Sequence, residues 1–155
     1  FMLGGSGKGL LKIAARHADI LNIIPPTSNG RDFVNDPAAT VAFDMATMKR
    51  RIAMLHGFMS DLDRDPQDIE LGGLVLFGLS KDPADAGLRE MASKLGFPDY
   101  ETAQRSPVAL IGTPDEVKCE LETRIKDTGV TYYIGLPSSQ ESYELLVAEV
   151  MPAFA

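Results

Sequence analysis

The feature that most constrains the fold is a repeated alternation of short apolar runs with longer segments of helical character. The apolar runs are continuous, as in IELGGLVLFGLS at residues 69–80. Strands that are apolar on both faces are typical of a parallel sheet with helices covering it. The sequence therefore predicts an α/β protein with parallel strands.

Expected strands and helices follow one another along the whole chain. We expect strands at residues 1–3, 18–24, 69–80 and 130–137, with a brief extended stretch in PVALIGT. We expect helices near residues 8–17, 38–62, 83–95 and 114–127, and a last helix that opens at Ser138 or Ser139. A long polar loop, TSNGRDFVN, joins the second strand to the second helix.

Several helix ends have recognisable signals. Asp36-Pro37 and Asp82-Pro83 each offer an N-cap followed by proline at the first helical position. Thr113 and Glu116 have the spacing of a capping box. Gly96 and Gly129 are expected to end the helices before them.

The Gly-rich stretch GGSGKG near the start matches neither common nucleotide loop. A Walker A loop needs a further glycine, separated by four residues from Gly-Lys-[Ser/Thr]. Here Met2 stands at that position, and Gly9 follows the Gly-Lys pair. The G-x-G-x-x-G fingerprint fails as well, because its third glycine would fall on Leu10.

The order of elements around this stretch still favours an anion site. An apolar strand end precedes the glycines, and a helical segment begins directly after them. A helix N-terminus presents free N–H groups and the positive end of the helix dipole. The alternative is a plain strand-to-helix turn in which the glycines only supply unusual backbone angles. The residues alone leave both interpretations open.

Composition and charge exclude several classes of function. The chain has 155 residues, 45% of them hydrophobic, and a formal net charge of -7 without any basic run, which argues against nucleic acid as a partner. No stretch is long enough to cross a bilayer, and no signal-peptide pattern is present, so no membrane association is expected.

Cysteine and histidine usage points the same way. The single Cys119 excludes an intramolecular disulfide and fits a reducing, cytoplasmic location. We expect this cysteine to be a buried, small apolar residue of its helix. His17 and His56 lie far apart without a cluster of cysteines or carboxylates, so no metal site is predicted.

Four separated motifs together resemble a known superfamily. They are LGGSGKGLLKIAARHADILN, DRDPQDIEL, ALIGTPDEV and DTGVTYYIGLPSSQESYELLVAEVMPAF. In this order they resemble the C-terminal half of the luciferase-like monooxygenase superfamily. They are most similar to members that use the deazaflavin coenzyme F420.

The resemblance implies a fold and a cofactor site. Members are (β/α)8 TIM barrels of roughly 300 residues. Residues 1–155 would then form a partial TIM-barrel domain, the C-terminal half with about four parallel strands, the N-terminal half being absent. By resemblance, Gly4, Gly5, Ser6 and Gly7 would bind the phosphate of F420 or flavin mononucleotide (FMN), with Lys8 as a charge partner.

The resemblance assigns no catalytic residue to this chain. The family's residues that shape the ring pocket and supply proton-transfer groups come mostly from the N-terminal half. Arg16 and His17 are expected at the outer end of their helix, and Asp19 at the start of the next strand. Tyr132 and Tyr133 alternate on a strand, so one is expected to face the barrel interior and the other the helices.

Two functional hypotheses follow. In the first, the intact protein is an F420- or FMN-dependent oxidoreductase that transfers hydride between its cofactor and a small organic substrate. In the second, the chain is a non-catalytic half-barrel module that binds a phosphate-bearing ligand or only assembles with a partner.

A half-barrel leaves its inner face uncovered, which bears on assembly. The residues expected on that face are Ile20, Leu74, Leu76 and Ile134. We expect a homodimer to cover them. The competing solution is a helix that swings across the open face, most plausibly residues 38–62.

Overall fold

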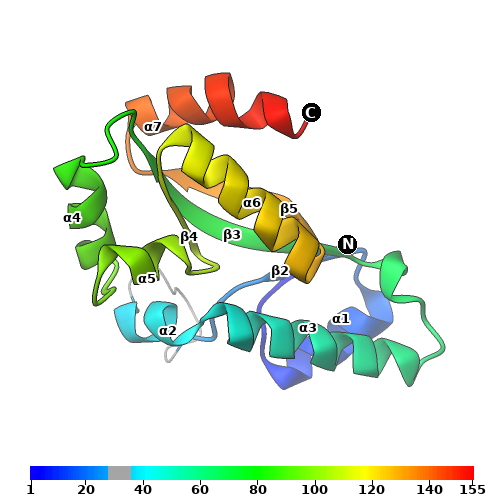
Figure 1. The fold of residues 1–155 in the computed structure, drawn as a ribbon. Coiled ribbons are helices and arrows are strands. Elements are labelled where there is room, and N and C mark those ends of the chain that lie inside the picture. Colours follow the sequence, from blue (N-terminus) through cyan, green and yellow to red (C-terminus); the bar gives the residue numbers. More distant parts are fainter. Residues whose placement is uncertain (28–35) are drawn as a thin grey trace.

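Five parallel strands form one sheet, and the central strand β3 contacts three of the others. The computed structural model describes residues 1–27 and 36–155, which exclude most of the predicted loop TSNGRDFVN. The elements are β1 (Met2–Gly4), α1 (Lys8–His17), β2 (Ile20–Ile23), α2 (Pro37–Ala42), α3 (Met45–Ser60), η1 (Pro66–Asp68), β3 (Glu70–Leu79), α4 (Ala86–Lys94), α5 (Tyr100–Gln104), β4 (Ala109–Gly112), α6 (Pro114–Thr128), β5 (Val130–Pro137), α7 (Gln140–Leu145), a π-helical turn η2 (Leu146–Val150) and η3 (Met151–Ala153). Figure 1 shows α6 beside the long β3 strand and α7 at one end of the molecule.

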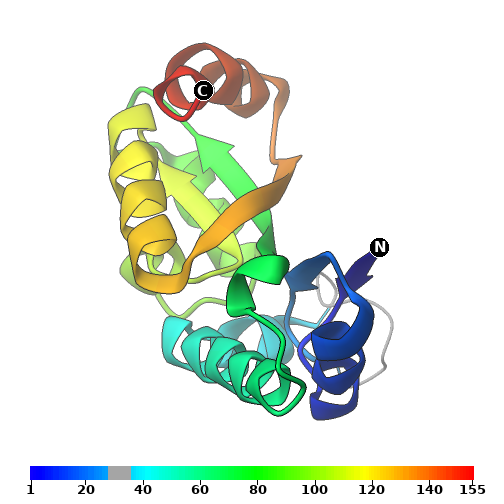
Figure 2. The same cartoon turned by 90° about the vertical axis from the view of Figure 1, so that its right-hand side faces the viewer.

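The two edges of β3 are used differently. One edge pairs with β5 from Leu71 to Phe77. The other edge pairs with β2 through its first residues and with β4 through its last four residues. Figure 2 shows β5 crossing the sheet next to β3. The path β1-β2-β3-β5 is therefore an open run of parallel strands, and β4 widens only its far end.

Alternate residues of β3 face two different environments. One face is covered by helices: Leu71 packs with α1 and α3, while Val75, Phe77 and Leu79 pack with α6 and α7. The opposite face has the half-buried Leu74 and Leu76. Ile20 and Ile134 share this face and are also half-buried, as expected for the inner surface of a barrel.

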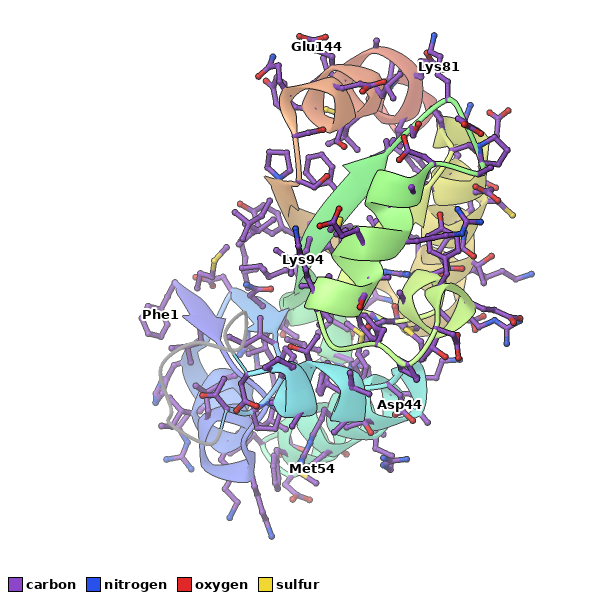
Figure 3. The ribbon with its side chains drawn as sticks, turned by 90° about the vertical axis from the view of Figure 1, so that its left-hand side faces the viewer. Phe1, Asp44, Met54, Lys81, Lys94 and Glu144 are labelled. Atoms are coloured by element: carbon purple, nitrogen blue, oxygen red, sulfur yellow. The ribbon has the colours of Figure 1, made fainter. Side chains whose placement is uncertain are left out.

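One helix covers part of the inner face, but it is not the predicted one. A Cβ atom on Gly78 would lie 2.7 Å from the sulfur of Met91 and 3.1 Å from Leu88, so α4 packs directly on this end of β3. Figure 3 shows α4, which ends at the labelled Lys94, lying across the strand. The segment 38–62 packs elsewhere, because the buried residues of α3 contact the core beside α1.

The segment 38–62 is also two helices rather than one. Phe43 and Asp44 separate α2 from α3. Phe43 is only 1% exposed, and Asp44 starts a new helix by accepting a hydrogen bond from the Thr47 amide at 2.7 Å. The chain thus leaves the helical conformation at Phe43, whose side chain is buried in the core, and Asp44 caps a second helix. The predicted Asp36 cap is confirmed, since its carboxylate accepts from the Ala39 amide.

The other predicted ends agree with the structure except at one helix. The capping box of Thr113 and Glu116 is confirmed, and Gly129 has the left-handed conformation that ends α6. The predicted start at Asp82-Pro83 is wrong. Asp82 instead closes a turn by accepting from the Ala84 amide, and α4 begins after Asp85, which accepts from the Gly87 amide.

Two elements exceed the prediction. The brief extended stretch in PVALIGT is a true strand, β4, paired with β3. The short helix α5 was not expected, although Asp99 caps it through the Thr102 amide at 2.7 Å. The predicted α/β class with parallel strands and covering helices is confirmed.

Cys119 does not lie where it was expected, because it is exposed. Helix α6 buries a stripe that includes Val117, Leu121 and Arg124. Cys119 falls between these positions on the helix and therefore faces outward. In the part of the chain that the structure describes, no helix is long and apolar enough to cross a membrane.

Candidate functional site

The Gly-rich loop lies where a parallel strand meets the N-terminus of a helix. Strand β1 ends at Gly4, and α1 begins at Lys8. The amide of Gly5 donates to the carbonyl oxygen of Asn22 at 2.9 Å, which fixes the loop to the end of β2. This is the carboxyl end of both strands, the edge at which barrel enzymes bind their ligands.

Gly5 shapes the loop. Its φ of 144° is a conformation that residues with side chains rarely adopt, and a Cβ atom there would lie 3.0 Å from Leu10. Ser6 also has a structural role, since it is only 1% exposed and its hydroxyl donates to the Ile24 carbonyl at 2.7 Å. The Ser6 hydroxyl therefore holds the loop against the end of β2.

Gly7 and Lys8 face outward. Gly7 is the N-cap of α1, with ordinary extended angles (φ −68°, ψ 145°), and provides no side chain to the helix amides. Among the described residues, apart from chain neighbours and the backbone of α1 itself, no heavy atom lies within 4 Å of a Cβ placed on Gly7 or on Gly9. The side chain of Lys8 is exposed at the same end of the helix.

Other helices among the described residues have a capping side chain at the N-cap position, where α1 has Gly7. The N-caps Asp36, Asp44, Asp85, Asp99 and Ser139 each accept a hydrogen bond from a backbone amide of the first turn. At Asp99 the amide of Thr102 is the main cause of a lowered pKa, because it stabilises the charged carboxylate. At α1 the glycine leaves the first-turn amides open to an external anion.

A buried amide lies directly beside the loop. Asn22 pairs in register with Gly4 on one side and with Gly72 on the other. The Asn22 residue is 6% exposed, and its Oδ1 atom has no hydrogen-bond partner within the described ranges. The sequence analysis missed Asn22, although it is the only polar residue between Ile20 and Ile24 in the apolar run ADILNII.

The open amides, the positive charge and the unpartnered acceptor fit a phosphate ester that also has hydrogen-bond donors. A phosphate can accept from the amides of α1 and pair with Lys8. A donor group of the same molecule can satisfy Asn22. The residues present therefore fit the phosphate portion of F420 or FMN.

Arg16, His17 and Asp19 lie away from this site, as predicted. Arg16 and His17 are exposed in the last turn of α1, about 12–14 Å from its first residue at 1.5 Å per residue. Asp19 is exposed and pairs with the amino group of Phe1. Among the described residues, no group of three or more metal-ligating side chains is close enough to hold an ion.

The two tyrosines of β5 divide as predicted. Tyr132 is 38% exposed and lies on the inner face with Gly72, its partner in register. Tyr133 is partly buried against both core clusters on the helix side, and burial raises its pKa to about 12.

A buried serine at the far end of the sheet is a second polar feature that the sequence analysis missed. Ser142 is 1% exposed, and its hydroxyl accepts from the Leu79 amide at 3.0 Å. Ser138 and Ser139 lie within hydrogen-bond distance of the same hydroxyl. These contacts tie the start of α7 to the end of β3.

Comparison with solved structures finds the same fold in larger proteins. Coenzyme F420-dependent tetrahydromethanopterin reductase from Methanopyrus kandleri matches 100% of this chain with a TM-score of 0.66 and 18% identity, over 51% of its own chain. Long-chain alkane monooxygenase LadA matches 99% with a TM-score of 0.67 and 12% identity, over 40% of its chain. Riboflavin lyase RcaE, solved with modified FMN, matches 99% with a TM-score of 0.65 and 9% identity, over 42% of its chain.

The chain spans only about half of the length of each of these enzymes and has the fold of that half. The predicted fold, half of a larger α/β protein with parallel strands and covering helices, is thus confirmed. No protein-family model and no curated protein sequence matches the chain.

Proposed function

We propose that the chain is the C-terminal half-barrel of a luciferase-like oxidoreductase whose loop Gly4–Lys8 binds the phosphate of F420 or FMN. The main support is the N-terminus of α1, which follows a parallel strand and has the exposed Gly7 as its N-cap. The sequence motifs and the neighbours described with F420 or FMN support the choice of cofactor.

The proposed reaction of the intact protein is hydride transfer between the cofactor and a small organic substrate. The bound cofactor supplies the redox chemistry, and the protein binds and orients it. On this chain, the α1 amides and Lys8 would hold the phosphate, and Ser6 keeps the loop in place. The half-buried Leu74 and Ile134 offer an apolar wall on the inner face. We assign no catalytic residue to the chain.

Cofactor titration of the full-length protein tests the proposal. Fluorescence of F420 and of FMN is followed for the wild type and for Gly7→Val. We expect Gly7→Val to weaken binding at least tenfold, because a branched side chain would stand where the anion approaches the amides. Its melting temperature should fall only slightly: valine is a poorer N-cap than glycine, but a Cβ on Gly7 meets no described atom within 4 Å outside its chain neighbours. Equal affinity in the two proteins, or binding of neither cofactor by the wild type, would refute the site.

The open sheet edges favour a second candidate, a module that assembles with a copy of itself. Within the described residues, β1 and β5 each pair with only one strand. Two copies related by a twofold axis along the strands would pair β5 with the partner's β1. Two β1-β2-β3-β5 paths together supply the eight parallel strands of a closed barrel.

Sedimentation of the purified 155-residue chain over a concentration series distinguishes this dimer from a monomer. We expect a dimer, because the exposed Tyr132 and Leu136 on β5 would be buried by the new strand pairing. A monomer at micromolar concentration with a cooperative thermal transition would exclude the dimer.

A further inference from the structure

The side chain of Asn22 has a hydrogen-bonding capacity that the fold does not use. Its main-chain oxygen already accepts from the Gly5 amide. The side-chain Oδ1 is buried and has no partner in residues 1–27 and 36–155. Buried polar atoms in folded proteins nearly always have a partner, so an unpaired acceptor next to a candidate ligand loop calls for one.

The two neighbours of Asn22 in register are glycines, Gly4 and Gly72. A row of residues in register crosses four strands: Gly4, Asn22, Gly72 and Tyr132. A Cβ on Gly72 would lie 3.1 Å from the Tyr132 carbonyl oxygen and 3.5 Å from the Asn22 Cα, so the strands approach closely here and a side chain at position 72 would be crowded. Leu21 and Ile23, the strand neighbours of Asn22, point into the helix-covered core. Asn22 therefore belongs to the inner face.

The chemistry of an amide oxygen restricts what it can bind. Oδ1 is an acceptor only, and it does not bind an ionised phosphate, which has acceptors but no donor. It needs an N–H or O–H group of the ligand. F420 and FMN both have a hydroxylated chain between the phosphate and the ring, which places O–H donors next to any bound phosphate.

We propose that Asn22 is a cofactor-binding residue whose Oδ1 accepts a hydrogen bond from a hydroxyl of this linking chain. The assignment rests on the proposed function, because the phosphate must lie at the N-terminus of α1. The loop amides would then bind the charged phosphate of the cofactor, and Asn22 would bind the uncharged hydroxylated chain next to it.

The test compares two single variants of the full-length protein with three ligands. The variants are Asn22→Leu, which removes the acceptor at nearly constant volume, and Gly7→Val, which blocks the loop. The ligands are F420, FMN and inorganic phosphate, and melting temperature is measured for each protein. For Asn22→Leu we expect at least fivefold weaker cofactor binding, unchanged phosphate binding, and an unchanged or higher melting temperature. For Gly7→Val we expect both cofactor and phosphate binding to weaken.

Each result decides between defined alternatives. If Asn22→Leu binds cofactor like the wild type, the assignment is wrong while the proposed function stands. If Asn22→Leu weakens both ligands and lowers the melting temperature, Asn22 is a structural residue and the assignment is again wrong. If the wild type binds neither cofactor, the proposed function fails and the assignment fails with it.

Discussion

A carboxylate introduced at Gly7 should stabilise the protein and abolish anion binding at the same time. Gly7 has the extended angles of an N-cap and open space around its Cβ position, so Gly7→Asp needs no rearrangement. At Asp99, which occupies the equivalent position of α5, the carboxylate accepts from the Thr102 amide at 2.7 Å. The introduced carboxylate would reach the amides that we assign to phosphate.

The expected magnitudes differ in sign for stability and binding. Replacing glycine by a capping residue gains a few tenths of a kcal/mol, and a negative charge at a helix N-terminus adds about 0.3–1 kcal/mol. The sum corresponds to a rise in melting temperature of about 1–4 °C for a chain of this length. Losing two charge-assisted hydrogen bonds costs the ligand about 3 kcal/mol or more, which weakens binding roughly a hundredfold.

Differential scanning calorimetry and fluorescence titration measure the two effects on the same samples. Gly7→Asn is the matched control, because it caps the helix equally well without the charge. It should gain less stability and lose less affinity than Gly7→Asp. A lower melting temperature for Gly7→Asp, or a cofactor affinity within threefold of wild type, would show that the α1 amides are not an anion site.

Three further outcomes are expected. Folding raises the pKa of Tyr133 from 10.0 to about 12, so the folded state favours the neutral phenol. This stabilisation is complete below pH 10 and is lost as the pH rises toward 12. The variant Tyr133→Phe should therefore show a smaller fall in melting temperature at alkaline pH. Arg64 donates to the carbonyl oxygens of Ala14, Ala15 and Ala18 at the end of α1. Arg64→Met should therefore lower the free energy of unfolding, measured by urea titration, by about 2–3 kcal/mol. The control Arg16→Met, at an exposed position, should leave it unchanged. The purified 155-residue chain should show no F420- or FMN-dependent turnover, because a phosphate loop alone cannot orient the reactive ring; turnover well above a blank would contradict this.

The sequence predicted most of the fold because its signals are local. Continuous apolar runs identified β2, β3 and β5, and the residues that cap α2, α6 and α7 act as expected. The errors arose where tertiary contacts decide. Phe43 interrupts a helical pattern because the core buries its ring, and β4 becomes a strand only by pairing with β3.

The order of the sheet was beyond the reach of the sequence. The sequence indicates that β3 is long, but not that β2 and β4 share one of its edges in succession while β5 takes the other. Register is set by pairing between segments far apart in the chain. The alignment of Asn22 with Gly4 and Gly72 follows from that register, and this explains why Asn22 was not predicted as a site residue.

The residues of the motif GGSGKG have different roles, which the sequence alone does not distinguish. Gly5 is required by its backbone angle and by Leu10, and Ser6 by its bond to Ile24. A substitution at either position disturbs the loop itself, so reduced binding in such a variant would not distinguish a ligand contact from a local folding defect. Gly7 and Asn22 lack that ambiguity: one has open space and ordinary angles, and the other has a side-chain oxygen that no described residue uses. At these two positions a loss of binding can be separated from a loss of the fold, and they therefore test whether the loop is a cofactor site or a turn.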